Sequence, residues 1–215
     1  MTSPWWPSRT LTAASRPRIP DLARTYVDSS VHDVAGVTSK LAGWLSAEDL
    51  PAKSVTLPSG RTVEVPRLLR QDTRRLDSIP RTSSCWAPNK PTLDLDGQPS
   101  WAEIVLVELL ERHGWEARWV RNLSGGHDFC HSVGQPKAML REAATMLAKI
   151  DHRARKTGAG AWDVWAWKGG SYLCLESRQH QSGDSLRPNQ LAWLEAAITE
   201  GVTRYAVVEW TAPRP

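Results

Sequence analysis

The stretch from Trp162 to Arg178, WDVWAWKGGSYLCLESR, constrains the fold more than any other part of the chain. Two runs of alternating aromatic and branched residues flank Gly169-Gly170, a pattern typical of a β-hairpin with a two-residue turn. If the two glycines form that turn, Lys168 pairs with Ser171 and the register of the whole hairpin is fixed. The sequence therefore predicts which side chains share each face of the hairpin.

This register brings two carboxylates together. Counting back along the ladder places Asp163 opposite Glu176, with Cβ atoms roughly 5 Å apart, where like charges destabilise a sheet unless a cation lies between them. Alternation along the second strand puts Arg178 on the same face as Glu176. Two acids and a cation thus converge at one end of the hairpin, which indicates a metal-dependent hydrolytic site.

These residues resemble the motifs of the PD-(D/E)XK nuclease superfamily, particularly its VRR-NUC branch. The resemblance rests on Asp163, on Glu176-Ser177-Arg178 and on Arg187-Pro188-Asn189-Gln190 at the start of a predicted helix. It covers roughly residues 100–212. Trp162 stands where the family usually has proline, and Arg178 stands where it has lysine.

The resemblance implies a restriction-endonuclease-like α/β core, with a mixed central sheet flanked by helices, that hydrolyses phosphodiester bonds in DNA. Asp163, Glu176 and the backbone carbonyl of Ser177 would hold Mg²⁺ or Mn²⁺, which prefer oxygen ligands. Arg178 would take the place of the motif lysine. It keeps the positive charge, but its fork is bulkier than an ammonium and it does not deprotonate.

Two further positions match polar residues that line the site in this family, and each has a simpler explanation. Glu103 matches a glutamate on the first helix, but Ser100 and Glu103 also form an S-x-x-E capping box, and the two roles compete for one carboxylate. Gln190 matches a polar position at a helix entrance, but it also fits an ordinary residue on a helix surface. The sequence leaves both choices open.

Three classes of function remain for the chain. The first is a metal-dependent endo- or exodeoxyribonuclease. The second is a module that keeps the nuclease fold and binds nucleic acid with weak or no cleavage, and Arg178 is the feature that divides these two. The third is an interaction protein in which Asp163 and Glu176 are only solvated.

The sequence predicts two structured parts. A small N-terminal α+β module would contain a helix from Val31 to Leu45, a second helix start at Ser46 and a hairpin over residues 54–65. The predicted organisation is a flexible tail at 1–20, this module at 21–81, a linker at 82–99 and the nuclease-like domain at 100–215.

Within the nuclease-like domain the periodicity predicts elements on both sides of the central hairpin. We expect a helix after Ser100 that ends at Gly114, a strand over 115–121, a loop beside the site, a helix over 136–156, a helix that Pro188 opens and Gly201 ends, and a strand over 203–210. The loop holds a cluster that could also suggest zinc, although it lacks a second ligand pair: His127, Asp128, Cys130 and His131.

Aromatic and basic residues leave further alternatives. Of 12 tryptophans most should be core, with Trp165 and Trp167 the better candidates for stacking on bases. A cluster of arginines reads either as a solvated face or as a phosphate-binding surface: Arg67, Arg70, Arg74, Arg75 and Arg81.

Composition sets the remaining limits. A formal net charge of +4 tolerates a DNA partner without demanding one. Three scattered cysteines (Cys85, Cys130, Cys174) predict no disulfide framework and favour a reducing, cytoplasmic location. No apolar run approaches the ~20 residues that span a bilayer, so we expect no membrane partner. A homodimer is compatible with the sequence.

Overall fold

The computed structural model describes residues 34–75, 79, 85, 87, 90–123, 126–132, 135–154, 160–180 and 185–213. The tail expected at 1–20 lies outside these ranges. The elements, in chain order, are α1 Val34–Leu45, β1 Glu48–Thr56, β2 Thr62–Gln71, β3 Arg74–Arg75, β4 Thr92–Leu95, β5 Gln98–Ser100, α2 Ala102–Arg112, β6 Glu116–Leu123, β7 Gly126–Ser132, β8 Gln135–Pro136, α3 Arg141–Ala154, β9 Val164–Lys168, β10 Ser171–Gln179, α4 Pro188–Thr199 and β11 Arg204–Thr211.

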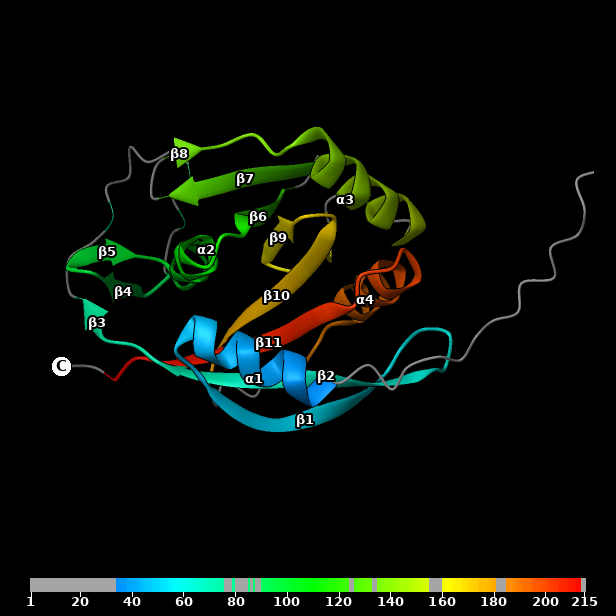
Figure 1. Ribbon diagram of the computed structural model, residues 1–215, viewed down its shortest axis with the longest axis horizontal. Coiled ribbons are helices and arrows are strands. Elements are labelled where there is room, and N and C mark those ends of the chain that lie inside the picture. The colour runs from blue at the N-terminus through cyan, green and yellow to red at the C-terminus, as the bar shows by residue number, and fades with distance from the viewer. Residues whose placement is uncertain are drawn as a thin grey trace, which may run out of the picture. The chain divides into compact units, whose positions relative to one another are not determined.

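An eight-stranded mixed sheet in the order β1-β2-β11-β10-β9-β6-β7-β8 forms the centre of the structure (Figure 1). The strands β10, β11 and β2 run parallel to one another, and the other neighbours are antiparallel. A small second sheet has the order β3-β4-β5. The α/β class with a mixed, helix-flanked sheet is therefore confirmed.

The central hairpin has the register expected from its two glycines. Lys168 pairs with Ser171 across the turn, and the ladder continues to the pair of Val164 with Leu175. Gly169 and Gly170 both have positive φ, 53° and 77°, as this type of two-residue turn requires. The next step of the ladder corresponds to Asp163 and Glu176.

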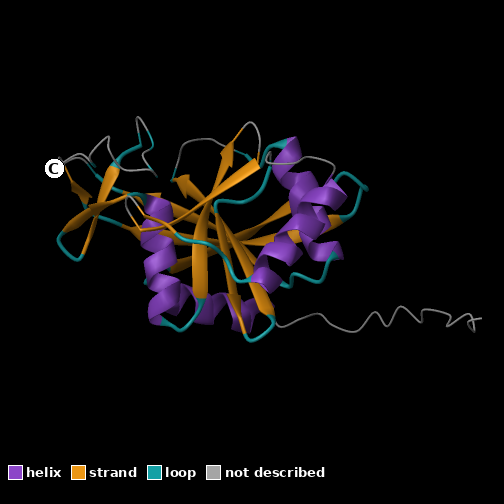
Figure 2. Ribbon diagram, turned by 90° about the horizontal axis from the view of Figure 1, so that it is seen from above, coloured by secondary structure: helices purple, strands orange, loops and turns teal. Residues whose placement is uncertain are grey.

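Helices cover both faces of the sheet (Figure 2). One apolar core contains side chains of α1 and α2 together with Val164, Ala166, Leu173 and Leu175 of the hairpin. The other core contains side chains of α3 and α4. It takes the alternate residues of the hairpin: Trp165, Trp167 and Cys174. Glu176 follows Cys174 in this alternation, and so belongs to the face that α3 and α4 cover.

The N-terminal segment differs from the separate module that we expected. The hairpin predicted over 54–65 exists as β1 and β2, but it is part of the central sheet, because β2 pairs in parallel with β11. Residues 32–215 form one compact unit. The helix start predicted at Ser46 is wrong, because Glu48 already begins β1.

Two segments assigned to linkers and loops contain strands. Residues 92–100 form the hairpin of β4 and β5, whose turn is Asp96-Gly97 with φ of 51° and 82°. The loop expected before Pro136 is instead β7, which pairs with β6. The sequence signals that could have indicated these hairpins are Asp96-Gly97 and Ser124-Gly125, the dipeptide between the paired residues Leu123 and Gly126.

Cys85 and Cys130 form a disulfide bond, which corrects the expectation that the cysteines are unpaired. Only Cys174 is a free thiol, and it is buried. The pairing is not predictable from spacing, because it depends on β7 lying in the sheet. Within the described ranges, no helix has the length and apolar character needed to cross a membrane.

Candidate active site

A pocket of about 400 Å³ opens where the first turns of α2 and α4 meet the ends of β9 and β10. It is lined by all six residues that the sequence singled out: Glu103, Asp163, Glu176, Ser177, Arg178 and Gln190. Glu103 is the second residue of α2 and Gln190 the third residue of α4. Two helix N-termini, with their partial positive charge, therefore flank one group of carboxylates.

Asp163 and Glu176 occupy the centre of the pocket. Asp163 immediately precedes β9, and its Oδ2 accepts a hydrogen bond from the backbone N–H of Ser177 at 3.0 Å. Glu176 is 5% exposed, and its Oε1 accepts a hydrogen bond from Nε2 of Gln190 at 2.6 Å. The backbone amide that follows Glu176 thus holds the carboxylate of Asp163 beside it.

Burial makes both carboxylates weak acids. Burial raises the pKa of Asp163 to about 7, and the negative charge of Glu103 adds to this effect. The pKa of Glu176 is raised well above its ordinary value, first by burial and then by the charge of Asp163. A buried carboxyl group whose pKa lies near 7, beside a second carboxyl group whose pKa is also raised, is poised to exchange its proton for a cation.

Glu103 does not form the capping box that its spacing suggested. Trp101 is the N-cap residue of α2 and makes no side-chain cap hydrogen bond. Glu103 is instead 4% exposed and forms an ion pair with Lys90 through its Oε1. The buried helix start, rather than its cap, determines where this carboxylate lies.

Lys90 is the cation that the sequence did not indicate. Burial lowers the pKa of its ammonium, but the charges of Glu103, Asp163 and Glu176 together outweigh burial, so that the pKa is raised. Its Nζ also lies 4.9 Å from the ring centroid of Trp119, a cation–π contact. Lys90 belongs to a Pro-rich segment without periodicity, so only the folded chain places it here.

Gln190 connects the second cation to the carboxylates. Its Oε1 accepts hydrogen bonds from Arg178 Nη2 and from the backbone N–H of Arg187, both at 3.0 Å. With two donors on the oxygen, its Nε2 must face Glu176, as observed. Arg178 Nη2 also lies 3.5 Å from Glu176 Oε1. The indole N–H of Trp162 donates a hydrogen bond to the carbonyl of Gln190 at 3.4 Å.

The donor set suits a hard divalent cation. Oε2 of Glu176 and Oε2 of Glu103 are buried, and neither has a hydrogen-bond partner among the described residues. Carboxylate and carbonyl oxygens are the ligands of Mg²⁺, which retains several waters and needs few protein ligands. Across the described ranges, however, no three His, Cys, Asp or Glu side chains are arranged to hold a metal ion by themselves.

The zinc alternative around Cys130 is not supported by the structure. Cys130 is in the disulfide, and the two histidines face separate acids: His127 Nε2 lies 2.6 Å from Asp151 and His131 Nε2 lies 2.6 Å from Glu111. Trp193 also donates to Asp151, at 2.9 Å. These contacts connect the outer strand β7 to helices on both faces of the sheet.

The stacking role suggested for Trp165 and Trp167 is wrong, because the two side chains are 1% and 7% exposed. Trp165 stacks on Tyr172 within the core at 5.3 Å. Three of the five clustered arginines pair with carboxylates: Arg67 with Glu209, Arg70 with Asp72 and Arg75 with Asp94. Arg81 lies outside the described residues.

Comparison with known proteins gives no further assignment. No protein-family model, no curated protein and no solved structure matches this chain. The pocket and the residues that line it are therefore the indication of function in this chain.

Proposed function

We propose that the chain is a divalent-metal-dependent nuclease that hydrolyses phosphodiester bonds in DNA. The observation that carries this proposal is the buried group of Asp163, Glu176 and Glu103 facing two cations, Lys90 and Arg178, in one pocket. A phosphodiester resists attack because of its own charge, so a hydrolytic site needs cations where charge develops and ligands for a metal beside them.

The order of the elements supports the same proposal. The helix α2, the strand β6, the hairpin β9-β10, the helix α4 and the strand β11 follow one another as in the resemblance to the PD-(D/E)XK superfamily, with β7, β8 and α3 inserted. The motif residues lie at the ends of β9 and β10 and at the start of α4. A restriction-endonuclease-like core is part of the proposal.

Each residue has a role in the proposed reaction. Asp163, Glu176 and the carbonyl of Ser177 would hold Mg²⁺ or Mn²⁺. The bound metal supplies a Lewis acid and lowers the pKa of a coordinated water. Gln190 orients Glu176 through its amide. Arg178, which donates to Gln190, would place a positive charge beside the phosphate.

Glu103 and Lys90 act as a pair in this scheme. The ammonium of Lys90 pairs with the buried Glu103 and adds a compact positive charge beside Asp163 and Glu176. Such a charge stabilises a phosphoryl group that gains negative charge. Lys90 would thus supply the kind of cation that Arg178 replaces in the motif.

A cleavage assay with matched variants tests the proposal. Linear, single-stranded and branched DNA are incubated with purified protein, with and without Mn²⁺. We expect metal-dependent cleavage by the wild type, and loss of at least about a hundredfold in Asp163→Asn and Glu176→Gln. Asp49→Asn, at an exposed position of β1, is the control. Equal cleavage by Asp163→Asn would refute the mechanism.

A second function, binding of nucleic acid without cleavage, is favoured by one observation. The guanidinium of Arg178 already lies 3.5 Å from Glu176, so part of the charge that a metal would neutralise is neutralised by the chain itself. In that case the wild-type protein binds DNA but does not hydrolyse it, whichever divalent metal ion is added. Asp163→Asn then leaves binding in place, whereas Arg178→Ala weakens it.

A further inference from the structure

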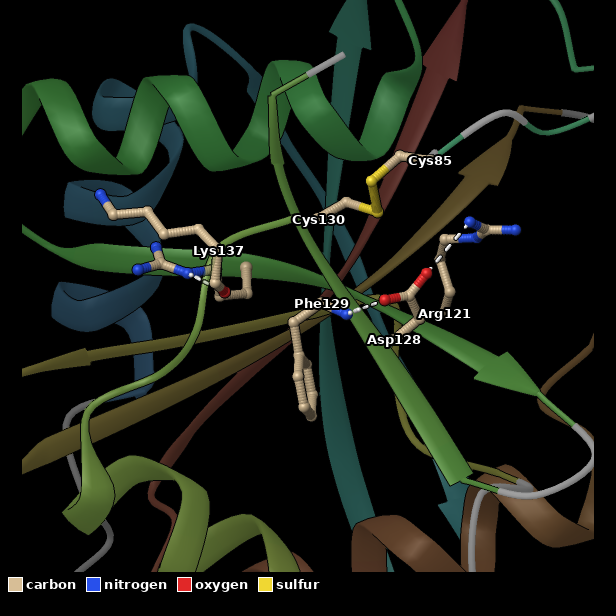
Figure 3. The surroundings of a disulfide bond; sticks show 7 residues. Cys85, Arg121, Asp128, Phe129, Cys130 and Lys137 are labelled. Carbon is tan, nitrogen blue, oxygen red and sulfur yellow. Dashed lines mark hydrogen bonds and ion pairs between the residues drawn. A yellow bond between two sulfur atoms is a disulfide. The ribbon is translucent and has the colours of Figure 1, made fainter. Parts of the chain in front are cut away.

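The disulfide bond between Cys85 and Cys130 lies close to the pocket in the chain and in the fold. Both side chains are fully buried, and 45 residues separate them in sequence. The bond joins β7 to the segment that precedes β4, beside helix α2 (Figure 3). Cys85 and Cys130 belong to the same apolar core as Trp101 and Trp119.

A short series of contacts leads from this disulfide to Lys90. Cys130 pairs directly with Trp119 in the ladder of β6 and β7. The ring of Trp119 lies under the ammonium of Lys90, which also contacts Glu103. Along the chain, the five peptide steps from Cys85 to Lys90 reach at most about 18 Å. While the bond is intact, Cys85 is attached to β7, and Lys90 therefore stays within that distance of the disulfide.

The segment that carries Lys90 has two anchors. On one side Thr92 begins β4, which pairs with β3 and β5. On the other side Cys85 is bonded to Cys130, and Ala87 packs against the same core. Without the disulfide, the pairing with a sheet that the described residues of this segment show lies on the β4 side. The segment then gains conformational freedom, and the docked position of Lys90 becomes one of several.

We propose that the Cys85–Cys130 disulfide positions Lys90 in the carboxylate pocket, and that a dithiol reductant releases it. A thiolate of the reductant attacks one sulfur and forms a mixed disulfide, and its second thiol then closes the reductant's own disulfide. Two electrons and two protons pass from the reductant to the chain, which ends with free thiols on Cys85 and Cys130. Because both sulfurs are buried, the attack requires local opening of the segment.

Release of Lys90 changes the pocket in a defined way. Glu103 loses its cation, so three carboxylates face one another, and Arg178 and Arg187 are the cations that remain among the lining residues of the pocket. Their mutual repulsion rises, and the positive charge beside Asp163 is lost. The effect on cleavage rests on the proposed nuclease function, whereas the effect on the position of Lys90 does not.

The position of Lys90 is measured first, by amine acylation and mass spectrometry. The side chain of Lys90 is 37% exposed, so its ion pair with Glu103 is what slows the reaction of its ammonium, and we expect the acylation rate of Lys90 to rise roughly tenfold when the disulfide is reduced. Lys53, an exposed lysine on β1, is the internal control and should not change. The double variant Cys85→Ala/Cys130→Ala should react like the reduced wild type without any reductant.

Cleavage is then compared between the same samples. We expect the reduced wild type and the double variant to cleave at least about tenfold more slowly than the oxidised wild type, since one preorganised cation is lost. If the double variant does not fold, reduced wild type with alkylated thiols replaces it, with far-ultraviolet circular dichroism as the check on folding.

Each result bears on one proposal. An unchanged acylation rate of Lys90 after verified reduction overturns the positioning role of the disulfide. Faster acylation with unchanged cleavage overturns its control over the site. Absence of cleavage in every redox state, with faster acylation after reduction, overturns the nuclease proposal and supports the positioning role.

Discussion

The carboxylate of Asp163 accepts a hydrogen bond from the backbone amide of Ser177, the residue next to Glu176. This contact fixes two acids side by side, since the donor amide belongs to the strand that carries Glu176. One such hydrogen bond favours the ionised form, but burial and the charge of Glu103 outweigh it and raise the pKa of Asp163 to about 7. Near neutral pH, a proton and a metal cation therefore compete for the carboxylate of Asp163.

The first prediction concerns stability without metal. The unfolded chain releases the proton of Asp163 near pH 3.8 and the native state near pH 7, so the native state holds more protons between these values. The free energy of unfolding should therefore fall as the pH rises from about 5 to 8. Asp163→Asn removes the free-energy cost of a buried, ionised carboxylate in the native state. The variant should therefore be more stable than the metal-free wild type at pH 8 by on the order of 2 kcal/mol. Urea unfolding at both pH values measures it.

The control for this experiment is Asp49→Asn, which alters an exposed aspartate and should leave the slope with pH unchanged. A wild type whose stability is flat between pH 5 and 8, or an Asp163→Asn variant that is less stable than wild type at pH 8, would contradict the prediction.

The second prediction concerns metal binding. Mn²⁺ must displace protons from Asp163 and Glu176, so its affinity should be higher at pH 8 than at pH 6. At about a hundredfold excess over the dissociation constant, Mn²⁺ should add about 2.7 kcal/mol and raise Tm by roughly 5–10 °C. Differential scanning fluorimetry measures this shift. Glu176→Gln should abolish it, and an equal shift in that variant would place the metal elsewhere.

The third prediction concerns Arg178. If the site cleaves, Arg178→Ala should lower turnover by a factor on the order of 10²–10³, as for loss of one preorganised charge. Arg178→Lys should retain or raise activity, because it keeps the charge on a more compact group. Single-turnover cleavage rates decide between these outcomes, with the exposed Arg141→Ala as control. An inactive Arg178→Lys variant would show that cleavage requires the guanidinium group that donates a hydrogen bond to Gln190.

The fourth prediction concerns binding to DNA. Lys90, Arg178 and Arg187 line the pocket, and three phosphate contacts should weaken binding roughly 40-fold between about 50 and 200 mM salt. Fluorescence anisotropy with a labelled oligonucleotide, in Ca²⁺ to prevent cleavage, measures the slope. Absence of binding even at low salt, with and without metal, would favour the interaction-protein interpretation.

Local patterns were sufficient for the parts of the fold that depend on neighbours in sequence. The Gly169-Gly170 turn fixed the register that brings Asp163 to Glu176, since a two-residue loop leaves one alignment of the strands. Pro188 and Gly201 marked the ends of α4, which carries Gln190. These elements contain most of the predicted site.

The rest of the site depends on contacts between distant segments. Nothing in the residues around Lys90 indicates that it faces Glu103, because this ion pair requires α2 and the segment before β4 to be packed together. The pairing of Cys85 with Cys130 likewise requires the strand β7, where the sequence predicts a loop. The Ser100–Glu103 spacing was misleading, because burial of the helix start overrides a local capping pattern.

The place of β2 between β1 and β11 also has a consequence for how the protein is made. Arg67 on β2 and Glu209 on β11 bond to each other although 142 residues separate them in the chain. During synthesis the ribosome needs on the order of ten seconds to produce the residues between β2 and β11. Until β11 has been synthesised, the edge of β2 that pairs with it has no hydrogen-bonding partner strand. For the same reason, a fragment that begins at residue 100 would lack β2 and leave the apolar strand YAVVEW of β11 as an open edge. An exposed strand edge pairs with the edges of other chains and causes aggregation. A fragment that contains the pocket therefore needs β1 and β2 to remain monomeric in solution.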